Sequence, residues 1–298
     1  MSIRHWLKAF RLRTLPLALS SIAMGGFLAW DAGAYRWDVF MLCIVTTIFL
    51  QILSNLSNDY GDSVHGADNG NRVGPSRAVQ SGVIQKHQMR LAMALFGILS
   101  LASGIILLLA SFGFQWGAIL FFLALGLLCI GAAITYTVGR RPYGYAGLGD
   151  LSVLIFFGLV GVLGSYYLFT KSISWYEVLP AMSMGLLSIA VLNINNIRDI
   201  ESDKVAGKYS IPVRLGRHKA IVYHWILLGL ALVFAFLYTL LKYDSPLQLI
   251  FLLAIPLFIR NGLAVTRKQP ELLDPYLKQM AVSTLLFVLL FGTGLVLR

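Results

Sequence analysis

The sequence has little charge and almost no cysteine. Charged residues make up 12% of the 298 residues, whereas soluble domains carry about 25%. Its two cysteines, Cys43 and Cys129, both lie in apolar stretches and provide neither a disulfide framework nor the spacing of a metal site. With 58% hydrophobic residues and a mean hydropathy of +0.76, the chain has too few polar residues to cover a soluble surface. The composition predicts an integral membrane protein.

Long apolar runs occur along the whole chain. Each has roughly 20 mostly apolar residues, which is enough for a helix to cross a hydrocarbon core of about 30 Å. Uninterrupted runs favour helices over barrel strands. We count nine, at 15–33, 38–58, 90–111, 115–137, 148–170, 177–198, 219–241, 246–265 and 278–297. We therefore predict an all-α bundle of nine transmembrane helices that forms a single domain over 1–298, with a short interfacial helix within 1–13.

The positive charge is spread over several short loops. A net charge of +11 on one face would indicate nucleic-acid binding, but dispersed basic residues do not form such a face. If the N-terminus is cytoplasmic, twenty of the 24 Lys and Arg residues lie on the cytoplasmic side. The four exceptions are Arg36, Lys171, Lys242 and Arg298. This asymmetry predicts a cytoplasmic N-terminus and places two long polar loops, 59–89 and 199–218, on the cytoplasmic side.

An acidic motif closes the second predicted span. Gln51, Asn55, Asp59 and Asp62 are separated by four, four and three residues, so a helix aligns their side chains on one face. Acidic residues inside a membrane span are costly and are functional candidates by default. This face therefore forms a column of oxygen ligands.

A second acidic motif closes the sixth predicted span. Asn195, Asp199 and Asp203 are spaced four residues apart, and the count of spans places them on the same side as the first motif. Carboxylates gathered in one pocket need cations, because they would otherwise repel one another and become protonated. Oxygen ligands without paired His or Cys suit Mg²⁺, which is usually also bound by substrate phosphates. A divalent-cation transporter is an alternative, since acidic residues also line ion paths.

Basic residues near both motifs suit a diphosphate. Arg77, Arg140, Arg198 and Lys208 lie close to the predicted cytoplasmic helix ends, where they could neutralise phosphate oxygens. The fifth span carries another pattern, with small residues at Gly158, Gly161 and Gly164. Small residues let membrane helices approach closely, so we expect these glycines to serve helix packing.

Four stretches of the sequence are similar to a known family. They are Leu50–Asp62, Gly74–Arg77, Thr135–Tyr145 and Leu192–Asp199. The chain resembles the UbiA-type intramembrane prenyltransferases over essentially its whole length. Within that family, these stretches look most like the members that prenylate 1,4-dihydroxy-2-naphthoate in menaquinone synthesis.

The resemblance implies roles for individual residues. Asn55, Asp59 and Asp62 would serve one Mg²⁺ site, and Asp199 and Asp203, supported by Asn195, would serve the other. Tyr136 and Arg140 match a motif that contacts the donor diphosphate, although the family has lysine where this chain has Arg140. Asp68 matches a further acid of the extended first motif, with acceptor orientation or proton removal as its open alternatives.

The resemblance also implies a reaction at the cytoplasmic face of a bacterial inner membrane. A polyprenyl group would pass from polyprenyl diphosphate to 1,4-dihydroxy-2-naphthoate with loss of diphosphate and CO₂, giving demethylmenaquinol. The long tail would lie in a hydrophobic groove open to lipid. Another aromatic acceptor, such as 4-hydroxybenzoate, is the alternative within the family.

Overall fold

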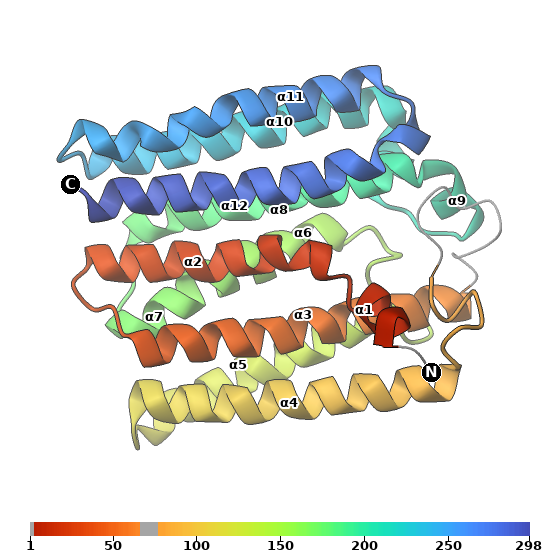
Figure 1. Ribbon diagram of the computed structural model, residues 1–298, viewed down its shortest axis with the longest axis horizontal. Helices are drawn as coiled ribbons and strands as arrows, with labels where there is room; N and C mark the ends of the chain where they lie inside the picture. Colours follow the sequence, from red (N-terminus) through yellow and green to blue (C-terminus); the bar gives the residue numbers. More distant parts are fainter. Residues whose placement is uncertain (1–2, 66–76) are drawn as a thin grey trace.

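A computed structural model describes residues 3–65 and 77–298. Within these residues all regular structure is helical (Figure 1), and nine helices are long and apolar enough to cross a membrane, as predicted. The elements are α1 (Ile3–Phe10), η1 (Leu12–Thr14), α2 (Leu15–Asp31), α3 (Trp37–His65), α4 (Lys86–Phe112), α5 (Trp116–Thr135), α6 (Gly149–Val153), η2 (Leu154–Gly164), α7 (Ser165–Thr170), η3 (Trp175–Glu177), α8 (Val178–Arg198), α9 (Ile200–Val205), α10 (Ile211–Leu241), η4 (Pro246–Ala254), α11 (Ile255–Arg267), η5 (Pro270–Leu272) and α12 (Asp274–Val296).

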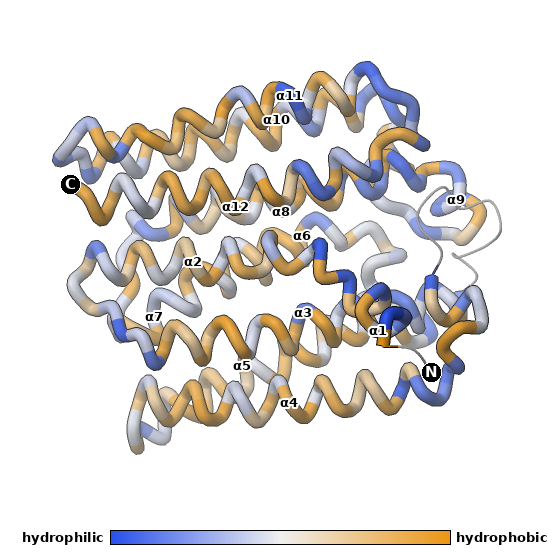
Figure 2. The backbone as a smooth tube through the Cα atoms, in the orientation of Figure 1, coloured by the Kyte–Doolittle hydropathy of each residue, from blue (hydrophilic) through white to orange (hydrophobic). Residues whose placement is uncertain are grey.

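The long helices run side by side along the bundle, as Figure 1 shows. Helix α8 packs against α10, η2 and α12, while α2 packs against α12 and α3 packs against α4. One large apolar core joins these elements, and a smaller one lies among α1, α3 and α4. We call the end that carries α1 and α9 the motif end, and the end that carries the C-terminus the far end. Hydrophilic residues gather most densely at the motif end (Figure 2).

The fifth span is not a uniform α-helix. Its central segment η2 is an 11-residue π-helix between α6 and α7. Two of its glycines pack closely, as predicted: a Cβ at Gly158 would lie 2.8 Å from Ala181 O, and one at Gly161 would lie 2.8 Å from Ser21 Cβ. The expectation for Gly164 was wrong, because a Cβ there would approach nothing nearer than Val160 Cγ1 at 3.8 Å. Gly164 therefore does not mark a close approach between helices.

The two acidic motifs differ in backbone structure. The first lies wholly within α3, which continues to His65. The second is bent, because α8 ends at Arg198 and Asp199 has φ −100° and ψ 13° before α9 begins at Ile200. The i to i−4 hydrogen bonds nevertheless continue through the bend, from Asp199 N to Asn195 O at 3.1 Å and from Asp203 N to Asp199 O at 2.8 Å.

Candidate active site

The first motif is buried at the motif end of α3. Asn55 is 3% exposed and its amide nitrogen donates to Phe10 O at 2.9 Å. Asp59 is 2% exposed and its carboxylate accepts from the backbone nitrogens of Ala78 at 3.0 Å and Val79 at 3.1 Å. These bonds hold the turn that follows residue 76 against α3.

Asp62 lies one turn further along α3 and forms a buried ion pair. Its Oδ2 accepts from Arg77 Nη2 at 2.7 Å, and its Oδ1 accepts from the Tyr145 hydroxyl at 2.9 Å. Charge-assisted bonds of this kind are stronger than neutral ones. They fix Asp62 between the turn after residue 76 and the loop that follows α5.

The second motif is organised by Arg198. The guanidinium donates to both Asp199 oxygens, from Nε at 2.8 Å and from Nη2 at 2.7 Å. It also donates to Asn195 Oδ1 at 2.9 Å and to Asp274 Oδ1 at 2.6 Å. Asp274 in turn accepts from Arg13 Nη1 at 2.9 Å. This ion-pair bridge ties α8 to the start of α12 and to η1.

Lys208 brings the two motifs together. Its Nζ lies 3.5 Å from Asp203 Oδ2. Burial alone would lower the pKa of the Lys208 ammonium, but attraction to Asp203 and Asp62 outweighs this and raises its pKa. Burial raises the pKa of the Asp203 carboxyl to about 6, and the nearby Lys208 opposes that rise. Asp203 is therefore paired with Lys208, as Asp62 is with Arg77.

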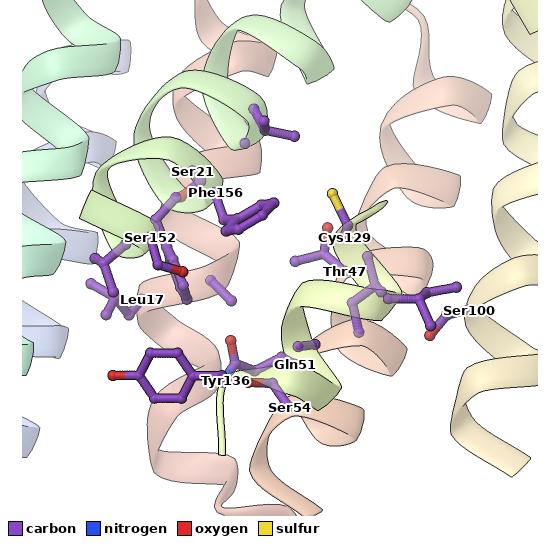
Figure 3. A pocket seen from close by; sticks show the side chains of 18 of the residues that line it. Leu17, Ser21, Thr47, Gln51, Ser54, Ser100, Cys129, Tyr136, Ser152 and Phe156 are labelled. Carbon is purple, nitrogen blue, oxygen red and sulfur yellow. The ribbon is translucent and has the colours of Figure 1, made fainter. Parts of the chain in front are cut away.

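A cavity of about 450 Å³ opens from this cluster into the bundle. Its polar end is lined by Asn55, Asp62, Arg77, Tyr136, Asn195 and Lys208. Burial raises the pKa of Tyr136 to about 12, so its hydroxyl stays protonated and can donate. Figure 3 shows Tyr136, Gln51 and Ser54 gathered at one end of the pocket, with Phe156 and Cys129 further in. The remaining lining is mainly apolar.

Five of the predicted residues that the structure describes are not in the lining of this cavity: Asp59, Arg140, Arg198, Asp199 and Asp203. Arg140 is exposed and borders a separate shallow pocket that also includes His65 and Tyr145. Among the residues placed in the structure, Lys208, Arg77 and Tyr136 are therefore closer candidates for a diphosphate than Arg140. Asp68 lies outside the described residues.

The oxygen groups present fit a divalent cation that is shared with a ligand. In the described part of the chain, no three His, Cys, Asp or Glu side chains are arranged to hold a metal alone. Asp203 Oδ2 and Asn196 Oδ1 are nevertheless buried without a hydrogen-bond partner. Mg²⁺ normally keeps waters and binds through one or two carboxylates plus phosphate oxygens. The donor set suits that mode of binding.

Some site residues were missed by the sequence reasoning. Tyr145 lies in a stretch that carries the family resemblance, but spacing alone gave no reason to single out its hydroxyl. The backbone nitrogens of Ala78 and Val79 carry no sequence signal, since any residue except proline has one. Asp274 contacts Arg198 across 76 positions, so no local pattern could reveal it.

Comparison with known proteins places the chain in a family. The sequence matches the UbiA prenyltransferase family over residues 18–295. It is 45% identical to the 1,4-dihydroxy-2-naphthoate octaprenyltransferase of Haemophilus influenzae, covering 99% of this chain and 96% of that protein. It is also 45% identical to the Escherichia coli protein of that name, covering 98% and 95% of the two chains.

Solved structures share the fold. A UbiA homologue from Aeropyrum pernix, in its apo form, has a TM-score of 0.68 at 18% identity and covers 100% of this chain and 98% of its own. A UbiA homologue from Archaeoglobus fulgidus bound to GPP and Mg²⁺ has a TM-score of 0.66 at 17% identity, covering 99% and 100%. From the sequence match, the relatives and the shared fold, we conclude that this multi-pass membrane protein belongs to the UbiA prenyltransferase family.

Proposed function

We propose that the protein transfers a polyprenyl group from polyprenyl diphosphate to 1,4-dihydroxy-2-naphthoate. The products are demethylmenaquinol, an intermediate of menaquinone synthesis, together with CO₂ and diphosphate. One observation carries the proposal: Asp62 of the first motif pairs with Arg77, Asp203 of the second lies 3.5 Å from Lys208, and both basic residues line the polar end of a mainly apolar cavity. The names of the two 45% identical relatives support this acceptor and an octaprenyl donor.

The chain binds the donor diphosphate at the polar end of the cavity. Lys208 and Arg77 supply positive charge there, and Tyr136 supplies a hydroxyl. Arg198 donates to Asp199, Asn195 and Asp274. It therefore positions the Asp199 carboxylate and adds a positive charge beside the second motif. Fixed cations of this kind stabilise the negative charge that grows on a leaving group.

Mg²⁺ would bind between the motifs, with Asn55, Asp59 and Asp62 on one side and Asn195, Asp199 and Asp203 on the other. When bound, it would act as a Lewis acid toward the diphosphate. This metal requirement agrees with the Mg²⁺ and GPP found together in the Archaeoglobus fulgidus homologue.

The reaction is a substitution on the aromatic ring. The allylic C–O bond breaks and its electron pair leaves with the diphosphate, while the apolar cavity walls keep water from the allylic cation. The ring carbon that carries the carboxylate then forms the new C–C bond. The carboxyl group departs as CO₂ and its bonding electrons restore the aromatic ring. No proton has to be removed from the ring, so the chain need not supply a base for that step.

We place the active site at the cytoplasmic face of a bacterial inner membrane, with a cytoplasmic N-terminus and one domain over 1–298. The charge asymmetry supports this orientation. All four basic residues expected on the opposite side, Arg36, Lys171, Lys242 and Arg298, are next to helix ends at the far end (Figure 1), where Arg298 pairs with Asp31 and donates to Lys242 O.

An assay with purified protein tests the proposal. The protein, Mg²⁺, octaprenyl diphosphate and 1,4-dihydroxy-2-naphthoate should give a prenylated and decarboxylated product by mass spectrometry. Asp59→Asn and Asp199→Asn should each lower kcat by about a hundredfold or more, because each removes a carboxylate that would hold Mg²⁺ beside the diphosphate. Asp38→Asn is the matched control, since Asp38 is exposed at the far end of α3.

Competing acceptors decide between the alternatives. Preference for 4-hydroxybenzoate over dihydroxynaphthoate would contradict the assigned acceptor. Full activity in Asp59→Asn or Asp199→Asn would contradict the site. Mg²⁺ flux into proteoliposomes without any prenyl donor would instead support a cation transporter.

A further inference from the structure

The Tyr136 hydroxyl is one of three groups proposed to bind the donor diphosphate, and no ion pair fixes its position. Arg77 pairs with Asp62, and Lys208 lies beside Asp203. In the part of the chain that the structure describes, the Tyr136 hydroxyl makes no hydrogen bond to another residue. Its place at the polar end of the cavity therefore depends on what packs against the tyrosine ring.

Two glycines and a second tyrosine enclose the Tyr136 ring, which Figure 3 shows at one end of the pocket. A Cβ added to Gly149 would lie 2.8 Å from Tyr136 Oη, and one added to Gly144 would lie 2.9 Å from Tyr136 Cζ. The Tyr143 ring meets the Tyr136 ring edge-on, with centroids 5.3 Å apart. We call the space bounded by Gly144, Gly149 and Tyr143 the tyrosine slot.

The backbone of the slot does not itself require glycine. Gly139 and Gly147 nearby have φ values of 118° and 84°, which side chains rarely adopt. Gly144 and Gly149 are not among the glycines with positive φ. An alanine could therefore take their backbone conformation. What excludes a side chain at both positions is the space that Tyr136 already fills.

The walls of the slot are fastened to α10. Asp150, which follows Gly149, accepts from the Tyr223 hydroxyl at 2.8 Å. In the loop that contains Gly144, Ala146 O accepts from Arg214 Nη2 at 2.7 Å. Tyr223 and Arg214 both belong to α10, whereas the ring inside the slot comes from the end of α5. The slot thus fixes a side chain of one helix against groups held by another.

The same arrangement fixes the hydroxyl relative to Lys208. Lys208 lies in the short segment just before α10 and lines the cavity together with Tyr136. Burial raises the pKa of Tyr136, and the positive charge of Lys208 opposes that rise more than any other group. The ammonium and the hydroxyl are therefore close neighbours. Fixed spacing between two donors matters because a leaving diphosphate is stabilised only by groups already in place.

We propose that Gly149 is a positioning residue, whose missing side chain leaves the place from which the Tyr136 hydroxyl donates to the diphosphate. The proposal rests on the proposed function, because it assumes a diphosphate at this end of the cavity. The alternative is a purely structural role, since a Cβ at Gly149 would also lie 3.3 Å from Leu192 Cδ2 on α8. The two roles differ in one respect: only the first depends on the Tyr136 oxygen.

A cycle of two substitutions tests this dependence. Gly149→Ala and Tyr136→Phe should each lower kcat/KM for octaprenyl diphosphate about tenfold, because each removes a hydrogen bond to a charged group. The double variant should stay within about twofold of Tyr136→Phe. Without the oxygen, the nearest ring atom to the new methyl group is Cζ, at 3.7 Å, which is an ordinary contact. Alanine at 149 is therefore harmless once residue 136 is phenylalanine.

Binding of inorganic diphosphate in the presence of Mg²⁺ provides a measurement without prenyl transfer. By calorimetry, Gly149→Ala and Tyr136→Phe should each weaken binding about tenfold, and the double variant should bind no more weakly than Tyr136→Phe. Gly131→Ala is the matched control, because a Cβ there would meet nothing within 4 Å and Gly131 does not line the cavity. A wild-type protein that bound diphosphate but transferred no prenyl group would refute the proposed function alone.

The remaining outcomes decide the role of Gly149. Equal losses from Gly149→Ala with tyrosine or phenylalanine at position 136 would assign Gly149 to packing against Leu192 and overturn the proposal. Wild-type diphosphate affinity in Gly149→Ala would also contradict it. If Gly149→Ala did not fold, a folded double variant would still identify the Tyr136 oxygen as the obstacle. Failure of both variants to fold would show that this oxygen is not the reason for glycine.

Discussion

Lys208 is the cation next to Asp203 in the second motif. Its Nζ lies 3.5 Å from Asp203 Oδ2, and it lines the polar end of the cavity. Arg140, which the family motif favoured, is exposed and borders a different pocket.

Substitution of these two residues should separate their roles. Lys208→Gln should lower kcat/KM for the prenyl donor about a hundredfold, because it removes the charge that faces the diphosphate. Arg140→Gln should lower it less than about threefold, since exposed charges interact weakly. Steady-state kinetics with a fixed acceptor concentration measures both. A larger loss in Arg140→Gln than in Lys208→Gln would reverse the assignment.

Local sequence patterns revealed the ligands but not their partners. Spacing identified the acids of both motifs, because a helix repeats every 3.6 residues. Carboxylates are also rare in membrane spans, since burying their charge there is costly. It could not reveal that Asp199 is held by Arg198 and, through it, by Asp274. It also treated the second motif as one straight stripe, whereas the backbone bends at Asp199. Contacts between distant residues depend on packing that no short pattern contains.

Between helices, a network of polar side chains joins α8, α10, α11 and α12. His224 on α10 lies 3.1 Å from Asn261 on α11 and 3.5 Å from Asn193 on α8. Asn261 also donates to Gln279 on α12, which donates to Ser283 at 2.9 Å. Four helices are thus joined by one set of hydrogen bonds. This set fixes α8, and with it the second motif, relative to its neighbours.

Removing the Asn261 amide, which lies at the centre of this network, should destabilise the bundle. Asn261→Leu removes the hydrogen bonds of Asn261 to His224, Gln279 and Tyr276 O, and interhelical hydrogen bonds in membranes are worth about 1–2 kcal/mol. The variant should unfold at a lower temperature in detergent than the wild type. Leu253→Ala, at a 68% exposed position on η4, should change the unfolding temperature less. An unchanged unfolding temperature in Asn261→Leu would show that this hydrogen-bond network contributes no stability.

Over the complete bundle, composition alone predicted the number of spans well. Nine apolar runs became nine helices in the described residues, because every backbone polar group in lipid must be paired within a helix. Composition did not predict the π-helical turns of η2 or the lack of a close helix contact at Gly164. Both depend on which neighbour a helix face meets. The glycine pattern therefore indicated close packing correctly at two positions and incorrectly at the third.

The orientation in the membrane can be measured with single cysteines. In a Cys43→Ser, Cys129→Ser background, Phe114→Cys lies between α4 and α5 at the far end, where Phe114 is 80% exposed. Glu201→Cys lies on α9 at the motif end, where the Glu201 side chain is 85% exposed. A membrane-impermeant maleimide applied to intact bacterial spheroplasts should label the first cysteine and reach the second only after lysis. The reverse pattern would place the active site on the outer face.

The ion-pair bridge from Arg13 through Asp274 to Arg198 has a consequence for synthesis of the protein. Asp274 opens α12, so the bridge cannot form until α12 has been made and inserted beside α2 and α8. Before then, the Arg198 guanidinium lacks one of its two acidic partners. A chain arrested before residue 274 would hold both acidic motifs but not this bridge. The motif end can therefore reach its final structure only after the chain has been synthesised as far as α12.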